Sequence, residues 1–418
     1  MPETPVASGS SPLRGSAHRS VALDFLRGVA ILLVLGRHWV VDPKEAGWLR
    51  PLAGALDRFG WTGVDLFFVL SGFLIGGLLL GELKKRRHLN VPRFLLRRAF
   101  KIWPLYYVFL VFVLIHDLRH GEAYGGLTTN LLHLQNYIPG SPRGHTWSLA
   151  VEEHFYLVLP MLLVLLAGGI KKRRPRDDSS TPDSSAASLG RIHYIPWIAL
   201  ALLVLCPIAR WIASAYLPLN SLLEETHFRI DALFFGVFLG YAYHFHQNAL
   251  DSIARHRRIL WFIAAACLTP LLFTDPGYSR FAYTFGFTLL TLGYSAILIL
   301  LIHTHPGLGL TGRVLTSFVG RTIAFIGTYS YAIYLWHIDL ANAPIAVRFR
   351  PLFNGYPAEL RWLIVTGAYV ALAVASAAIL SKLVERPALL LRDKFFPPRA
   401  VVTIEADTEV RPELAVAA

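Results

Sequence analysis

The chain has 418 residues, of which 54% are hydrophobic and 16% are charged, and its mean hydropathy is +0.48. A soluble domain carries about 25% charged residues, so this chain has more apolar surface than one soluble core can bury, and a lipid bilayer is the solvent that suits the excess. The formal net charge of +13 does not indicate nucleic-acid binding, because the basic residues cluster in short loops between apolar segments. Cys206 and Cys267 both lie in apolar segments, which excludes a disulfide framework and a cysteine metal site.

Ten apolar segments are long enough to cross a bilayer. A helical span needs about 20 mainly apolar residues, and continuous rather than alternating runs favour helices over strands. We predict an all-α polytopic transmembrane bundle of about ten spans. The predicted spans are residues 21–41, 61–82, 102–118, 147–169, 195–217, 229–247, 259–275, 281–303, 321–344 and 361–384.

The loops differ strongly in charge. With a cytoplasmic N-terminus, the inner segments carry 26 Lys and Arg and the outer segments carry 8, which matches the positive-inside rule and places the N- and C-termini in the cytoplasm. Residues 1–20 and 393–418 are predicted to be disordered cytoplasmic ends. Residues 21–392 form one membrane domain, in which 170–194, rich in Ser, Asp and Pro, is a flexible cytoplasmic loop.

The first span contains Asp24, Arg27 and His38. Arg27 and His38 are 11 residues apart, close to three helical turns, so they share one face, with Asp24 near it. Ionisable groups inside spans are usually functional or paired. The sequence leaves two interpretations open: an Asp24–Arg27 ion pair with a structural histidine, or a functional site.

A basic stripe precedes the third span. Arg93, Arg97 and Lys101 recur at intervals of four residues, with Arg98 beside them. Guanidinium groups bind phosphate bidentately, so the stripe fits a phosphorylated ligand, and anionic lipid headgroups are the alternative.

The fourth span begins with Trp147 and brings Glu152, Glu153 and His154 close to the outer surface, at the depth expected for His38. A histidine with a carboxylate partner is a common arrangement for general-base catalysis. Interfacial charge flanked by belt aromatics is the alternative.

Other polar residues lie near the outer ends of spans, whereas Gly72 and Gly76 form a small-residue pair that indicates helix packing. These outer polar residues are Asp65, Arg229, Asp231 and His337. Together with Asp24 and Glu153 they are assigned to an acceptor site or a supporting role. One end of the bundle is therefore suited to phosphate, and the other collects histidines and carboxylates. A long phosphorylated carrier could keep its head in the cytoplasm while its reactive end reaches the outer half.

Several motifs occur in an order that is typical of one family. They are Leu-Asp-Phe-Leu-Arg-Gly-Val-Ala at 23–30 with His38 beyond it, Gly-Val-Asp-Leu-Phe-Phe-Val-Leu-Ser-Gly-Phe-Leu-Ile at 63–75, Arg-Arg at 97–98 before Trp-Pro-Leu-Tyr at 103–106, Trp-Ser-Leu-Ala-Val-Glu-Glu-His-Phe-Tyr at 147–156, Arg-Ile-Asp-Ala-Leu-Phe-Phe-Gly at 229–236, Tyr-Ser-Tyr at 329–331 with Leu-Trp-His at 335–337, and Val-Glu-Arg-Pro at 384–387. Across residues 21–392 the chain resembles the integral-membrane acyltransferase-3 family, whose members O-acylate surface glycans and related molecules.

The resemblance implies site residues. It makes Arg27 and His38 essential, identifies Glu152 as the family's first glutamate, and assigns Arg97 and Arg98 to donor binding. The family usually has arginine where this chain has Lys101, which keeps the charge but loses bidentate contact. It also usually has glutamine at the position of His154.

The resemblance predicts a membrane O-acyltransferase of the bacterial inner membrane. Acyl-CoA, most simply acetyl-CoA, would be the donor substrate, with Arg93 and Lys101 adding to its site, and no tightly bound cofactor or metal is expected. His38, oriented by Glu152, would deprotonate a hydroxyl of a glycan or lipid-linked glycan, and both direct transfer and a covalent acyl-enzyme remain open. Without the extracytoplasmic hydrolase-like domain of some members, a separate transferase could complete the reaction. The alternative function is a transporter or flippase for a lipid-linked glycan.

Overall fold

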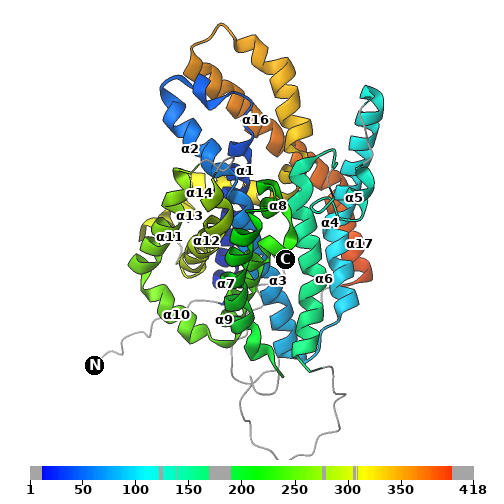
Figure 1. Cartoon of the computed structure of the whole chain (residues 1–418), viewed down its shortest axis with the longest axis vertical. Helices are drawn as coiled ribbons and strands as arrows, with labels where there is room; N and C mark the ends of the chain where they lie inside the picture. The colour runs from blue at the N-terminus through cyan, green and yellow to red at the C-terminus, as the bar shows by residue number, and fades with distance from the viewer. Residues whose placement is uncertain are drawn as a thin grey trace, which may run out of the picture.

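The computed structural model describes residues 12–121, 126–138, 140–168, 190–274, 279–304, 307 and 309–397, and all regular structure in these ranges is helical. The all-α prediction is confirmed. The predicted disorder at residues 1–11 and 398–418 and most of the predicted loop 170–194 lie outside the described residues. The helices run mainly along the long axis of the molecule, and parts of α2 and α16 project at one end (Figure 1).

Each of the ten predicted spans coincides with a helical segment. The segments are α1 (Pro12–Arg37), α3 (Gly63–Arg86), α4 (Val91–His120), α6 (Trp147–Leu166), α7 (Ile195–Ala213), α9 (Thr226–Phe245), α11 (Arg257–Leu272), α12 (Phe287–Ile302), α14 (Phe318–Thr328) with α15 (Ser330–Trp336), and α16 (Ala358–Leu380). Shorter helices are α2 (Arg50–Gly60), α5 (Leu127–Leu131), α8 (Leu219–Glu224), α10 (Gln247–Arg255), α13 (Gly309–Thr316) and α17 (Arg386–Phe395).

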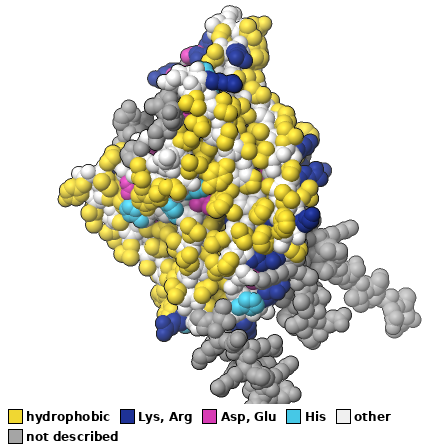
Figure 2. Space-filling view, turned by 90° about the vertical axis from the view of Figure 1, so that its right-hand side faces the viewer, with side chains coloured by type: hydrophobic (Ala, Val, Ile, Leu, Met, Phe, Trp, Pro, Cys, Tyr) yellow, Lys and Arg dark blue, Asp and Glu magenta, His cyan; other side chains and the backbone are white. Residues whose placement is uncertain are grey.

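Six helical segments of the described chain are long and apolar enough to cross a membrane. They are 63–86, 91–120, 144–166, 192–213, 282–302 and 358–395. The surface agrees, because hydrophobic side chains cover most of the face in Figure 2, and most Lys and Arg groups lie at its margins. The chain is a membrane protein, whereas the count of ten spans and the cytoplasmic placement of the termini stay predictions.

Several helix ends differ from the predicted boundaries. Helix α1 begins at Pro12, inside the stretch predicted to be disordered, because proline is favourable in a first helical turn. Helix α4 begins at Val91 rather than at residue 102, since the side chain of Asn90 caps it by accepting from the Arg93 amide at 3.0 Å. The basic stripe and the apolar third span are therefore one continuous helix.

The predicted ninth span is not one straight helix. Helix α14 ends at Thr328, α15 runs over Ser330–Trp336, and residues 337–342 continue as a π-helix. The last predicted span also passes through a π-helical segment, Ser381–Glu385, before α17. Wide π-turns inside membrane helices change the direction of side chains and occur often at functional sites.

Glycines bring the central helices into direct backbone contact. A Cβ atom at Gly72 of α3 would lie 2.0 Å from the Leu233 carbonyl oxygen of α9, and one at Gly76 would lie 2.9 Å from the Val237 Cα. This confirms the packing role predicted for the pair. Gly327 of α14 is equally close to α1, because its Cβ would lie 1.8 Å from the Asp24 carbonyl oxygen. The packing holds α9 against α3 and α14 against α1.

Candidate active site

A cavity of about 560 Å³ opens between α1, α3, α4, α6, α14, α15 and α17. Charged and polar side chains share its wall with apolar ones. The charged lining residues are Asp24, Arg27, Arg97, Arg98, Lys101, Glu152, Glu153, Arg392 and Asp393. Its size is within the usual range for small-molecule sites, about 300–1,000 Å³.

Most of the cations at this cavity have acidic or carbonyl partners within the protein. Arg27 pairs with Asp24 at 3.4 Å, so the structural pairing considered from the sequence is present, although both residues line the cavity. Arg97 pairs with Asp393 at 3.2 Å, and the Lys101 ammonium pairs closely with Glu385.

Arg98 differs from these cations. Among the described residues its guanidinium has neither a hydrogen bond nor a carboxylate within ion-pair distance, and it lies 5.8 Å from the centroid of the Phe94 ring. Arg93, the fourth residue of the predicted donor group, does not line the cavity and donates to the Pro397 carbonyl oxygen. Arg98 is thus the cation at this site that is open to an anionic ligand.

Glu152 and Glu153 face the same cavity but differ in their partners. Glu152 accepts hydrogen bonds from Ser71 Oγ and from the Tyr156 hydroxyl, both at 2.8 Å. Glu153 accepts from Trp103 Nε1 at 3.4 Å, and its Oε1 atom is buried without a hydrogen-bond partner in the described structure. One carboxylate is therefore fixed in place, and the other keeps an acceptor position open.

The structure assigns a packing role to His154, which stands where the resembled family usually has glutamine. Its Nδ1 atom lies 2.7 Å from Thr226 Oγ1 at the start of α9, and its ring lies against Tyr137 with the centroids 6.0 Å apart. His154 joins α6 to α9 outside the cavity.

Three histidines from distant parts of the chain form a cluster. The ring centroids of His38 and His337 are 5.1 Å apart, and those of His145 and His337 are 5.4 Å apart. We call these residues the histidine cluster. In the described part of the chain they do not form a group with the spacing of a metal site. His145 escaped the sequence analysis because it precedes the fourth span in a loop, although it lies only two residues before Trp147.

Backbone carbonyls fix the tautomers of two of these histidines. His337 Nδ1 lies 2.7 Å from the Tyr334 carbonyl oxygen, and His145 Nε2 lies 3.2 Å from that of Leu335. A carbonyl only accepts, so these nitrogens carry hydrogen. The other nitrogens, His337 Nε2 and His145 Nδ1, are buried without a hydrogen-bond partner in the described structure.

The Tyr334 hydroxyl connects the cavity wall to the histidine cluster. Tyr334 and Ser148 line the cavity, and their hydroxyl oxygens are 2.6 Å apart. The Tyr334 hydroxyl also donates to the His145 carbonyl oxygen at 2.5 Å. His38, His145 and His337 are not among the described cavity-lining residues, so the cluster is connected to the cavity wall through the Tyr334 hydroxyl.

The structure does not place Glu152 and His38 in hydrogen-bond contact. Ser71 and Tyr156 engage the two oxygens of Glu152, whereas His38 has its ring against His337. The predicted orientation of His38 by Glu152 is thus not a direct contact in this conformation, and the neighbour of His38 is another histidine.

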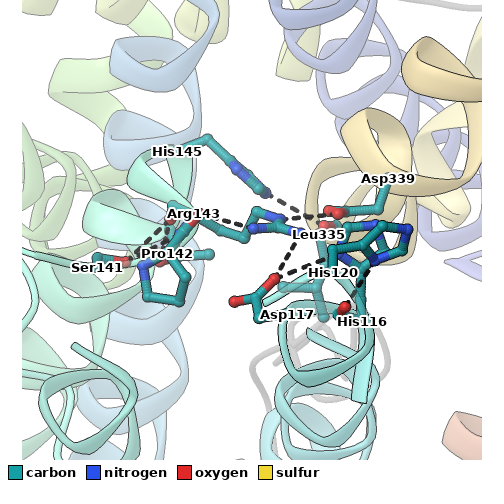
Figure 3. A network of polar contacts seen from close by, with 10 residues as sticks. His116, Asp117, His120, Ser141, Pro142, Arg143, His145, Leu335 and Asp339 are labelled. Carbon is teal, nitrogen blue, oxygen red and sulfur yellow. Dashed lines mark hydrogen bonds and ion pairs between the residues drawn. The ribbon is translucent and has the colours of Figure 1, made fainter. Parts of the chain in front are cut away.

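An arginine-centred network supports the cluster (Figure 3). Arg143 Nε donates to Asp339 Oδ1 at 2.7 Å, and its Nη2 lies 3.5 Å from Asp117 Oδ1. Arg143 therefore ties the loop that carries His145 to α4 and to the π-helix that begins at His337. Both carboxylates are almost completely buried, and such groups are stable only when paired.

The predicted supporting residues Asp65, Arg229 and Asp231 belong to a second buried network. Arg229 Nη2 donates to Asp65 Oδ1 at 2.6 Å, and Arg210 pairs with Asp231 at 2.9 Å. All four side chains are at most 1% exposed. The Arg229 guanidinium lies 3.5 Å from the centroid of Phe287. None of the four lines the cavity, and the two ion pairs join α3 and α7 to α9 inside the bundle.

The model of the acyltransferase-3 family, described as an acyltransferase domain, matches residues 20–382. The chain is 26% identical over 351 residues to the peptidoglycan O-acetyltransferase OatA of Listeria monocytogenes, covering 76% of this chain and 49% of that protein. It is 28% identical over 366 residues to the putative peptidoglycan O-acetyltransferase YrhL of Bacillus subtilis, covering 80% and 51%.

A third relative, the O-acetyltransferase OatA of Staphylococcus aureus, is 25% identical over 338 residues, which cover 76% of this chain and 50% of that protein. The chain thus spans about half the length of the curated relatives it matches. No solved structure matches it.

Proposed function

The chain belongs to the acyltransferase-3 family, and from that premise we propose that it is a membrane O-acyltransferase that moves an acetyl group from acetyl-CoA to a hydroxyl of a glycan. The observation that carries the proposal is the cavity itself. It has an open guanidinium, that of Arg98, in its wall, and the Tyr334 hydroxyl links it to the histidine cluster. The names of the relatives support the acetyl group and the glycan.

The donor head binds where the cations gather. CoA carries several phosphate groups, and charge-assisted hydrogen bonds from arginine are the strongest protein contacts with phosphate. Arg98 contributes the open guanidinium, and Arg97 lies one position before it on α4. The pantetheine arm then occupies the cavity, so that the thioester lies near Tyr334 and Ser148.

The transfer step needs a base for the acceptor hydroxyl. In direct transfer, His38 takes the hydroxyl proton while the oxygen attacks the thioester carbonyl. The C–S bond then breaks, and the departing thiolate takes the proton from the imidazolium. His337 packs against His38, and its hydrogen bond to the Tyr334 carbonyl holds its ring in one orientation. A fixed neighbour of this kind limits the positions that the His38 ring can adopt.

Calorimetric titration of the detergent-purified protein with acetyl-CoA tests the donor site. Arg98→Gln is expected to weaken binding by about 10- to 100-fold, because a hydrogen bond to a charged group contributes roughly 1.5–3 kcal/mol. Arg37→Gln is the matched control, since Arg37 is an exposed arginine paired with Asp57 and does not line the cavity.

The second test separates binding from chemistry. His38→Ala is expected to bind acetyl-CoA like wild type but to lose transfer of the acetyl group to the acceptor. Full transfer by folded His38→Ala would exclude His38 as the base. If wild type binds neither acetyl-CoA nor longer acyl-CoAs but moves a lipid-linked glycan across vesicles, the chain is a transporter and the proposal is wrong.

A further inference from the structure

Helix α17 forms one wall of the cavity although it lies beyond the family match. The match ends at residue 382, and α17 covers Arg386–Phe395. Three of its residues, Leu389, Arg392 and Asp393, line the cavity. The side chain of Arg392 is 14% exposed, whereas that of Asp393 is 41% exposed. The helix therefore places one sheltered cation and one accessible anion at the basic end of the cavity.

Asp393 occupies the position between two guanidiniums. Its Oδ1 accepts from Arg392 Nε at 2.9 Å and from Arg97 Nη1 at 3.2 Å, and its Oδ2 accepts from Arg392 Nη2 at 3.1 Å. A carboxylate that receives a bidentate contact from one arginine and a single contact from another reproduces the binding of a phosphate oxygen pair. The same two arginines are thus arranged to bind a phosphate group.

Backbone carbonyl groups at the end of α17 accept hydrogen bonds from two other arginines of the basic stripe. Arg97 also donates to the Phe396 carbonyl oxygen, and Arg93 donates to that of Pro397. Of the cavity-lining cations on α4, Arg98 alone is left open, and this holds for the part of the chain that the structure describes. A phosphorylated donor that uses Arg97 must therefore compete with groups of α17.

We propose that α17 completes the donor site: Arg392 binds a phosphate of acyl-CoA together with Arg97 and Arg98, and Asp393 competes with that phosphate for both Arg97 and Arg392. The inference rests on the proposed function, because it deepens the same donor site. Displacement of Asp393 costs little, since its side chain is already partly in solvent and exposed ion pairs are weak. Arg392 stays in the cavity wall and gains the phosphate as its partner.

Two ligands and three variants test this inference. Acetyl-CoA carries the phosphates, and acetyl-pantetheine carries the same thioester without them. Arg392→Gln is expected to weaken acetyl-CoA binding by about tenfold or more, whereas Asp393→Asn should tighten it by about twofold to fivefold, the range of a partly exposed ion pair. Binding of acetyl-pantetheine should change in neither variant. Lys394→Gln, which removes a charge from the exposed side of the same helix and lies outside the cavity lining, should behave like wild type with both ligands.

The outcomes that contradict the inference are distinct from failure of the proposed function. If Arg98→Gln weakens acetyl-CoA binding but Arg392→Gln does not, the donor site stands without α17. Weaker acetyl-CoA binding by Asp393→Asn would show that Asp393 holds Arg97 and Arg392 in place for the phosphate rather than competing with it. Asp393→Glu, which keeps the charge, checks that this loss of binding does not come from misfolding. If wild type does not bind acetyl-CoA, the proposed function itself fails.

A lipid headgroup is the other source of phosphate at this end of the molecule. Titrations in micelles with and without phosphatidylglycerol distinguish the two. Competition by the lipid that disappears in Arg392→Gln, with no change in acetyl-CoA affinity measured without lipid, would assign Arg392 to the membrane and overturn the inference.

Discussion

The ion pair between Asp65 and Arg229 is expected to stabilise the bundle rather than to take part in chemistry. Both side chains are 1% exposed, and the nitrogen–oxygen distance is 2.6 Å. Asp65→Asn keeps the size of the side chain but leaves the Arg229 guanidinium without its charge partner in an apolar surrounding. Breaking a buried pair from one side costs about 3–5 kcal/mol, so the free energy of unfolding should fall by that amount.

Removing both charges should restore most of this loss. In the double variant Asp65→Leu/Arg229→Met neither charge has to be desolvated, and a well-packed apolar replacement of a buried pair is often neutral. The methionine can also keep a contact with the ring of Phe287, over which the Arg229 guanidinium now lies. The neighbouring ion pair of Arg210 and Asp231 is left unchanged in the double variant.

Equilibrium unfolding in detergent, followed by acetyl-CoA titration of the folded fraction, measures both quantities. We expect the order of stability to be wild type and double variant above Asp65→Asn, with equal acetyl-CoA affinity in all folded samples. Wild-type stability of Asp65→Asn would refute the energetic reasoning. A stable double variant without acetyl-CoA binding would place Asp65 and Arg229 in the site.

Three further predictions concern packing, support and pH. Gly327→Ala should lower the free energy of unfolding in detergent by about 1–3 kcal/mol, because the new Cβ would lie 1.8 Å from the Asp24 carbonyl oxygen. The control is Gly367→Ala, whose new Cβ would meet nothing within 4 Å and which should be neutral or slightly stabilising. Arg143→Ala should cost about 3 kcal/mol in the same assay, because it leaves two buried carboxylates without their shared partner; unchanged stability would show that this network is not structural. Burial lowers the pKa of His133, in the loop after α5, from its ordinary 6.5 to about 4, so protonation favours the unfolded state. The free energy of unfolding should therefore be highest above pH 6.5 and should be lower by about 1 kcal/mol at pH 5.5. This decrease should be absent in His133→Gln.

The sequence allowed the helices to be predicted but not how they end. Continuous apolar runs specify helices in lipid because backbone groups must bond within the segment, and each predicted span does contain a helix. The break after Thr328 was not predicted, although Gly327 lies directly before it and Thr328 and Ser330 interrupt the apolar run there. Helix α17 crosses the predicted end of the membrane domain at residue 392, so the predicted disorder is wrong for Asp393–Phe395, which are helical. Its periodicity does not reveal that it folds back onto α4.

The candidate site was predicted in part for a related reason. Helical spacing grouped Arg27 with Asp24 and Arg97 with Lys101, and all four line the cavity, whereas His38, placed on the same face as Arg27, is not among its described lining residues. Spacing within one helix cannot identify partners on other helices, so Ser71 and Tyr156 as the partners of Glu152 were not foreseen. Such partners depend on which helix faces meet, and small residues such as Gly72 decide this.

The broken ninth span explains why the histidine cluster lies where it does. The Tyr334 carbonyl accepts from His337 Nδ1, and this hydrogen bond over three residues occurs at the change from α15 to the π-helix. In a regular α-helix that carbonyl would be taken by the backbone amide four residues later, so the imidazole uses an acceptor that the wider turn makes accessible. The Tyr334 hydroxyl meanwhile reaches the His145 carbonyl in the loop before α6. One tyrosine therefore holds His337 through its backbone and the His145 loop through its side chain, which brings both histidines to the end of α1 where His38 lies.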